Sequence, residues 1–232
     1  SFELDGQLIE TRLFMHHPGG TWAGYTYEWN EAETLATRVL GGKTRQVGVQ
    51  SWEYPSEGAC LRCHTNVAGR SLGPETSQLN RDYTYAATDR TANQVHTLEE
   101  IGVFAMPAPG DPATLPSLPD PFGGGEFDAR ARSYLHTNCS FCHRPGGEAS
   151  TDIDLRYTTA FADTQTCNVN PQRGDFGLPI ARIVRPGDSA NSVLLERVNR
   201  RDTFQMPPLA SSVIDQPGVG LLRDWIDSLT GC

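Results

Sequence analysis

The sequence predicts a mainly α-helical fold with extensive loops and a small β-rich region at its N-terminus. Three observations lead to this prediction. The 232 residues include 23 Gly and 16 Pro, which favours turns and short elements over long helices. Apolar residues recur at helical spacing in two stretches of the second half. Alternating Thr, Tyr and Trp residues near the N-terminus instead indicate strands.

Residues 1–57 form the predicted β-rich region. Residues 8–14 and 22–29 alternate in polarity and are rich in Thr, Tyr and Trp. They are separated by His17-Pro18-Gly19-Gly20, a turn-forming sequence. We therefore expect a β-hairpin whose loop carries histidines.

Two cysteine pairs carry the strongest functional signal. Residues 60–64 (CLRCH) and 139–143 (CSFCH) both match C-x-x-C-H, the attachment signal for c-type haem. Two thiols at this spacing reach the two vinyl groups on one porphyrin edge, and the histidine then supplies an axial nitrogen to the iron. A zinc site would leave both histidines unexplained, and a thioredoxin-like redox pair needs a βαβ context that is absent. The sequence therefore predicts two covalently attached haem c groups, bound through Cys60, Cys63, Cys139 and Cys142, with His64 and His143 as iron ligands.

The first motif belongs to a predicted haem-binding unit, residues 58–108. Within it, residues 93–104 carry Val95, Leu98 and Ile101 on or near one face, which predicts a short helix. Residues 109–125 are rich in proline and end in three glycines. That composition predicts a linker, extended at first and then flexible.

Residues 126–232 form a second predicted haem domain. One apolar stripe runs into the second motif and another lies near the C-terminus, and each predicts a helix. Pro217-Gly218 is expected to break the chain just before the second helix. The two stripes consist of Phe127, Ala131, Tyr134 and Leu135, and of Val219, Leu222, Ile226 and Leu229.

A helix ending in C-x-x-C-H, a later Met206-Pro207 segment and a closing helix resemble the class I cytochrome c module, so the expected fold is cytochrome c-like. The chain as a whole resembles dihaem c-type cytochromes that occur as modules of larger periplasmic or secreted bacterial redox proteins. The resemblance implies that Met206 ligates the second iron opposite His143 and raises its potential. It also implies that a carbonyl at Pro74 accepts a hydrogen bond from His64. Arg156 is a candidate partner for a haem propionate.

The sequence leaves the distal ligand of the first haem open. Met106, followed by Pro107, repeats the Met-Pro pattern, but it comes after a predicted helix and not before one. His17, His16 and His96 are alternatives, as is an open or water-bound iron. The aromatic residues of 22–29 are expected to cover this haem, with a sugar-binding surface as the alternative.

Composition restricts the partners. A net charge of −9 argues against nucleic acid, which needs a basic face, and no run approaches the roughly 18 apolar residues of a membrane helix. With Lys43 as the single lysine, we expect redox partners with basic or neutral docking surfaces. Residues 1–5 lack the features of a signal peptide, so we expect a mature form or an excised module.

Haem attachment outside the bacterial cytoplasm predicts a periplasmic or extracellular location, where a Cys167–Cys232 disulfide would persist. The expected function is one-electron transfer between redox proteins or between modules of a larger polypeptide. The alternatives are a dihaem peroxidase-like enzyme with one open haem iron and a small-molecule sensor.

Overall fold

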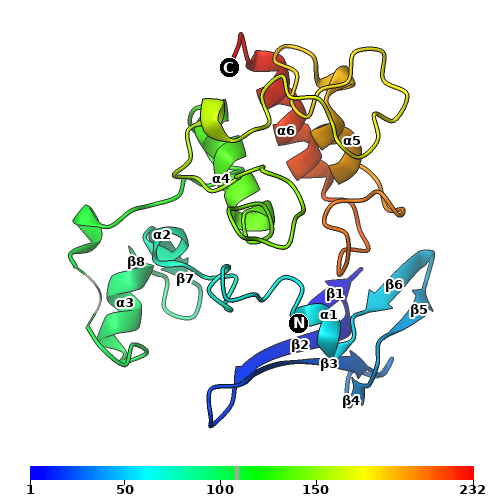
Figure 1. The fold of residues 1–232 in the computed structure, drawn as a ribbon. Coiled ribbons are helices and arrows are strands. Elements are labelled where there is room, and N and C mark those ends of the chain that lie inside the picture. The colour runs from blue at the N-terminus through cyan, green and yellow to red at the C-terminus, as the bar shows by residue number, and fades with distance from the viewer. Residues whose placement is uncertain (108–109) are drawn as a thin grey trace.

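The structure is a computed structural model that describes residues 1–107 and 110–232. A twisted sheet built from the N-terminal residues, a small unit of short helices and one hairpin, and a helical domain formed by the C-terminal half lie around a central region (Figure 1). The two C-x-x-C-H motifs lie at this centre, because α1 of the first motif is close to the sheet and α4 of the second runs toward it.

The helices are short except for two. In chain order the α-helices are α1 (Glu57–Cys60), α2 (Thr76–Leu79), α3 (Gln94–Glu100), α4 (Phe127–Cys139), α5 (Val193–Val198) and α6 (Gln216–Ser228). The strands are β1 (Phe2–Leu4), β2 (Gln7–His16), β3 (Trp22–Trp29), β4 (Ala36–Val39), β5 (Lys43–Val47), β6 (Gln50–Tyr54), β7 (Asp82–Tyr85) and β8 (Arg90–Asn93). Short 3₁₀ turns occur at Pro112–Thr114, Phe161–Asp163 and Ser189–Asn191.

The N-terminal region is an antiparallel sheet of strand order β1-β2-β3-β4 with a separate β5–β6 hairpin beside it. The predicted hairpin is confirmed: β2 and β3 pair from Glu10↔Glu28 to His16↔Trp22, and the connecting loop contains His17. The sheet extends further than predicted, since β1 and β4 pair with its two edges.

A small core joins the sheet to the second hairpin. It consists of Ile9, Val39, Trp52 and Tyr54. The fully buried Glu10 lies beside it, held by Arg12 at 2.5 Å and by the Trp52 indole N–H at 2.9 Å. Because an unpaired buried carboxylate is costly, these contacts are what make Glu10 tolerable there.

The predicted helix over 93–104 forms, but α3 ends at Glu100. The Asn93 side chain accepts from the N–H groups of Val95 and His96 and so caps its start. Gly102 has φ +71° just past the helix end, the left-handed conformation that commonly terminates a helix. The helix is therefore shorter than its apolar pattern.

The proline-rich segment is hydrogen-bonded on both sides, which its composition did not predict. The buried Asn80 amide donates to the carbonyls of Pro112 and Leu115, at 2.9 Å each. At the other end the Ser133 hydroxyl of α4 donates to the Pro119 carbonyl at 2.7 Å. The described part of this segment therefore lies against the first unit and α4. Ala108 and Pro109 lie outside the described residues.

Both helices predicted from the apolar stripes form, and α6 packs against α4 in the C-terminal domain. Trp225 of α6 is buried and donates from its indole N–H to Asp128 of α4 at 3.2 Å. The expected break at Pro217-Gly218 is wrong, because both residues lie in the first turn of α6. Gly218 allows close packing there: an added Cβ would lie 2.3 Å from the Tyr134 hydroxyl oxygen.

The prediction of a mainly α-helical fold is wrong. Among the described residues, helices hold 24% and strands 20%, because the sheet continues beyond the predicted hairpin and the first unit adds β7–β8. Two of the helices, α1 and α2, also stop after one turn. Gly and Pro favour turns and loops over long helices, so much of this chain is in loops.

Candidate functional site

The second motif sits at the C-terminal end of α4. Cys139 is the last residue of the helix, and the following turn is closed by N–H groups of Cys142 and His143 that donate to the Cys139 carbonyl, at 3.1 and 2.9 Å. The chain then turns away from the helix axis. This local geometry places both cysteines and the histidine of the motif on one compact turn.

A largely apolar cavity of about 230 Å³ lies beside this turn. It brings residues of the motif together with Met206, which is half-buried. Thus two features predicted from separate parts of the sequence share one cavity. Its lining includes Leu135, Cys139, Cys142, His143, Ile183, Val193, Leu194 and Met206.

Burial controls the protonation of the motif residues. Burial lowers the pKa of His143, and the positive charge of Arg197 lowers it further, so the imidazole is kept neutral, the form that ligates metals. The Thr151 hydroxyl lies 3.5 Å from its Nδ1 atom. Burial also raises the pKa of the Cys139 thiol to about 12. A neutral thioether suits this apolar wall better than the thiolate that zinc requires.

Two arginines at the cavity were not identified from the sequence. Arg173 and Arg197 both line it, and the Arg197 guanidinium donates to the carbonyls of Phe204, at 3.1 Å, and of Arg173. Burial and the nearby charges of Arg200 and Arg173 lower the pKa of Arg197. A cluster of cations beside an apolar cavity is suited to the carboxylates of a bound ligand.

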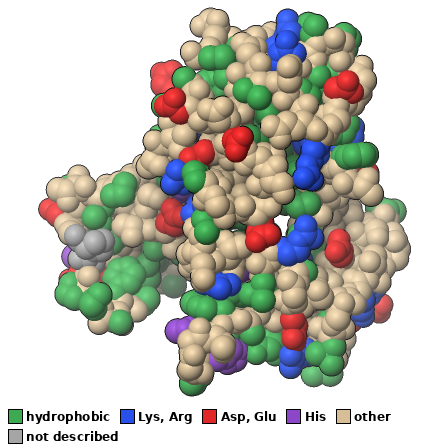
Figure 2. Space-filling view, viewed as in Figure 1, with side chains coloured by type: hydrophobic (Ala, Val, Ile, Leu, Met, Phe, Trp, Pro, Cys, Tyr) green, Lys and Arg blue, Asp and Glu red, His purple; other side chains and the backbone are tan. Residues whose placement is uncertain are grey.

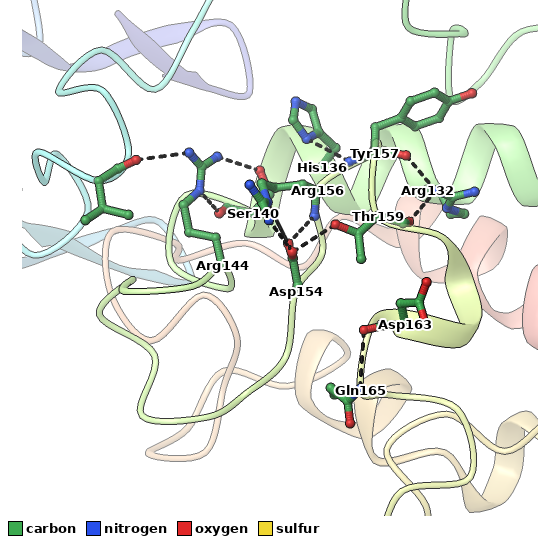
Figure 3. A network of polar contacts seen from close by, with 11 residues as sticks. Arg132, His136, Ser140, Arg144, Asp154, Arg156, Tyr157, Thr159, Asp163 and Gln165 are labelled. Carbon is green, nitrogen blue, oxygen red and sulfur yellow. Dashed lines mark hydrogen bonds and ion pairs between the residues drawn. The ribbon is translucent and has the colours of Figure 1, made fainter.

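Arg156, the candidate propionate partner, is engaged elsewhere. Its guanidinium binds the buried Asp154 carboxylate at 2.6 and 2.9 Å, and the Thr159 hydroxyl donates to the same carboxylate (Figure 3). Arg156 therefore organises the loop after the motif. Arg173 and Arg197 lie on the cavity instead.

The first motif begins at Cys60, the last residue of α1, and this helix packs against β3. Ser56 caps the helix, and Cys60 lies so close to the sheet that a Cβ added to Gly24 would be 2.4 Å from its sulfur. His64 donates from Nδ1 to the Arg70 carbonyl at 2.6 Å. The expectation that Pro74 provides this carbonyl is wrong, since the chain turns back sooner, at Arg70. The contact leaves Nε2 of His64 as the available ligand atom.

Aromatic rings from the sheet cover His64. Phe14 stacks on the imidazole at 3.9 Å between centroids, Trp22 stacks on Phe14 at 5.1 Å, and His16 stacks on Trp22 at 4.7 Å. Phe14 comes from β2 and lies outside the predicted stretch 22–29, whereas Trp22 belongs to that stretch. Tyr25, an odd-numbered position of β3, lies on the other face and bonds His17 at 2.8 Å.

The candidate distal ligands of the first site lie in different places. Met106 is 77% exposed and follows α3, which lies well apart from α1 (Figure 1). His96 is exposed on α3 itself. His16 is exposed at the end of β2, separated from His64 by two rings. The structure therefore brings none of Met106, His96 or His16 into contact with His64 within the described residues.

The two motifs lie near each other. Cys63 of the first motif lines the cavity of the second, and Arg144, just after the second motif, donates to the Val67 carbonyl in the loop after the first at 3.2 Å. This proximity was not predicted from the sequence, because it depends on how separate segments pack. Across the parts of the chain that the structure describes, no three His, Cys, Asp or Glu side chains are grouped as a metal site.

The other two cysteines pair with each other. Cys167 and Cys232 lie at disulfide distance, with sulfur atoms 2.02 Å apart, as the sequence predicted. The bridge ties the C-terminus to the loop after the second motif. Within residues 1–107 and 110–232, no helix is both long and apolar enough to cross a membrane.

In comparisons with known proteins, the chain matches no family model, no curated protein and no solved structure.

Proposed function

We propose that the protein is a dihaem c-type cytochrome that transfers single electrons between extracytoplasmic redox partners. The observation that supports this most strongly is the cavity shared by His143, both cysteines of its motif and Met206. An apolar space with a covalent attachment pair, a neutral imidazole and a thioether on its walls has the donor set of a c-type haem.

A bound c-type haem would supply one-electron iron chemistry at each motif. The protein's own residues set the conditions for it. His143 presents a neutral nitrogen, Met206 offers a soft sulfur that favours the ferrous state, and the aliphatic lining excludes water. Arg197 supplies positive charge at the edge of the cavity.

The first motif supports the same function through His64. Its Nδ1–H is held by the Arg70 carbonyl, and such a contact fixes the ring and makes Nε2 a better ligand. Phe14 covers one face of the imidazole. Cys60 and Cys63 are the attachment residues of this site.

The partners follow from charge. The chain carries a net charge of −9, and acidic and basic side chains are interspersed over the face shown in Figure 2. A basic or neutral docking surface on the partner suits this distribution. The partner is either a separate redox protein or another module of a larger polypeptide. The Cys167–Cys232 pair supports a periplasmic or extracellular location.

A dihaem peroxidase-like enzyme is the second candidate. It is favoured by the exposure of Met106, because the first iron then lacks a methionine from this position. Such an enzyme needs one iron that is open to peroxide.

Carbon monoxide binding to the reduced protein separates the two functions. The gas binds only where an axial position is free or easily vacated. An unchanged optical spectrum supports electron transfer, with both irons six-coordinate. A shift in about half of the haem absorbance, together with turnover of hydrogen peroxide, would replace electron transfer by the enzyme.

A further inference from the structure

The segment that follows Met206 is bonded to the N-terminal β-rich region. Residues 207–213 contain no helix or strand and reach from the C-terminal domain to β6 (Figure 1). The Gln50 side-chain amide of β6 donates to the Ser212 carbonyl at 2.7 Å, and the Ser212 hydroxyl accepts from the Glu53 N–H at 3.3 Å. The segment therefore lies against β6, although 162 residues separate Gln50 from Ser212 in the sequence.

A third contact comes from β2. Arg12 is held by the buried Glu10 carboxylate, with nitrogen–oxygen distances of 2.5 and 2.7 Å, and its remaining nitrogen, Nη1, donates to the Ala210 carbonyl at 3.4 Å. Ala210 has φ +60°, a left-handed conformation that is uncommon for a residue with a Cβ and persists where surrounding contacts hold it. This strained residue of the segment lies at its contact with the sheet.

Hydrogen bonds within the segment connect these contacts to Met206. The Gln205 side-chain amide donates to the carbonyls of Pro207 and Ser211, at 3.0 and 3.1 Å, and Pro207 and Pro208 each fix one backbone angle. Both prolines line the cavity together with Met206. Because the loop is short and internally bonded, a movement at its far end would displace Met206 as well.

We propose that the N-terminal region positions Met206 at the cavity, with Gln50 as a positioning residue that acts through the Ser212 carbonyl. The second site is then completed by strands that lie outside residues 126–232, the predicted haem domain. Loosening their contacts lets the segment, and the sulfur with it, move away from the cavity. The holding of the segment does not depend on what the cavity binds, whereas its effect on an iron ligand rests on the proposed function.

Gln50→Glu tests the positioning, because it keeps the shape of the side chain and replaces the amide donor by an acceptor. The matched control is Gln46→Glu, which adds the same charge to the same hairpin at an exposed residue whose amide donates to Gly48. Hydrogen exchange of the peptide covering residues 204–214 is followed by mass spectrometry in the protein as isolated. We expect exchange to be about fivefold faster in Gln50→Glu, the factor for one lost hydrogen bond, and unchanged in Gln46→Glu. Equal exchange in the two variants would overturn the proposal.

The position of the sulfur is measured in the haem-loaded protein. Potentiometric titration and carbon monoxide binding to the reduced form report it, because loss of a methionine ligand lowers the potential and vacates an axial position. We expect Gln50→Glu to lower the potential of one haem and to bind carbon monoxide several-fold more tightly than Gln46→Glu does. Faster exchange with an unchanged potential would mean that β6 holds the loop without positioning Met206, and this result would also overturn the proposal.

Ser212→Ala repeats the test without a change of charge, since it removes the hydroxyl that accepts from Glu53. Ser211→Ala, at the neighbouring residue, is its control, and only Ser212→Ala is expected to show the two effects. Haem content, from the mass of the denatured protein, separates failure of the positioning from failure of the function. A chain without haem refutes the function, and hydrogen exchange alone then decides whether β6 holds the segment. Two haems with no difference between Gln50→Glu and Gln46→Glu refute only the positioning.

Discussion

The backbone N–H of Met206 donates to the carbonyl oxygen of Arg197, with 2.9 Å between nitrogen and oxygen. Arg197 belongs to α5 and lines the same cavity as Met206. The bond therefore fixes the methionine segment to a helix whose side chain brings positive charge to the cavity. The same backbone positions the sulfur and the charge, and the Arg197 guanidinium also holds the Phe204 carbonyl of the methionine segment.

Met206→Leu tests the sulfur. Leucine conserves volume but provides no ligand, so we expect the potential of one haem to fall by on the order of 0.1 V, within the roughly 0.8 V range set by axial ligands. Carbon monoxide should then bind to half of the haem. Potentiometric titration and optical spectra measure both effects. Met106→Leu is the matched control: because Met106 is 77% exposed, both potentials should stay unchanged. An unaltered spectrum in Met206→Leu would remove the residue from the ligand set.

Arg197→Gln tests the charge. A cation near a haem disfavours the more positive ferric state, so its removal should lower the potential of the second haem. At an effective dielectric constant of about 20, the interaction is on the order of 1 kcal/mol, or tens of millivolts. The control is Arg223→Gln, which removes the same charge from an exposed position of α6. Equal shifts in the two variants would mean that only net charge matters.

Gly24→Ala tests the close packing of α1, which carries Cys60 of the first motif, against β3. The added methyl would lie 2.4 Å from the Cys60 sulfur, a distance that forces α1 away from β3. We expect attachment at the first site to be lost, leaving one haem per chain by absorbance and mass. Gly58→Ala is the control within α1, where an added methyl meets no atom within 4 Å. Two haems in Gly24→Ala would show that α1 does not need this close packing.

Asp154→Asn tests the loop after the second motif. Hydrogen bonding from Arg156 lowers the pKa of Asp154 from 3.8 to about 2. A carboxylate whose pKa is depressed by folding adds stability above its unfolded pKa, and this stability is lost as the pH falls through the folded value. After allowance for the partly exposed Arg156, the contribution is about 1–2 kcal/mol.

The free energy of unfolding should therefore decrease in Asp154→Asn at pH 7, and its dependence on pH between about 4 and 2 should flatten. Urea denaturation at several pH values measures both. Asp163→Asn provides the comparison, since Asp163 is exposed and its carboxylate lies outside the network (Figure 3). Parallel pH profiles for wild type and Asp154→Asn would contradict the assignment.

Local patterns in the sequence predicted local structure well. The stripe through Ala131 and Leu135 predicted α4, the alternation in residues 22–29 predicted β3, and both form. Each pattern is read within one element, so no knowledge of the rest of the chain is needed. Because side chains alternate between the two faces of a strand, Trp22 and Tyr25 of β3 lie on opposite faces. The composition of the strand alone did not predict this difference.

Relationships between elements were not predictable in this way. Nothing local indicates that Arg70 provides the carbonyl for His64, or that Arg197 and Cys63 line the cavity of the second motif. Each depends on how separate segments pack. The helix content was overestimated for a related reason, because the sheet grows by pairing β1 and β4 with a hairpin that was already predicted.

The most direct test of the central claim is the mass of the denatured protein after expression in a bacterial host that attaches c-type haem. We predict the mass of the chain plus two haems, with the added mass found after proteolysis on the peptides containing Cys60–Cys63 and Cys139–Cys142. An unmodified mass, with all four thiols free to alkylate, would contradict the proposal that this is a dihaem cytochrome.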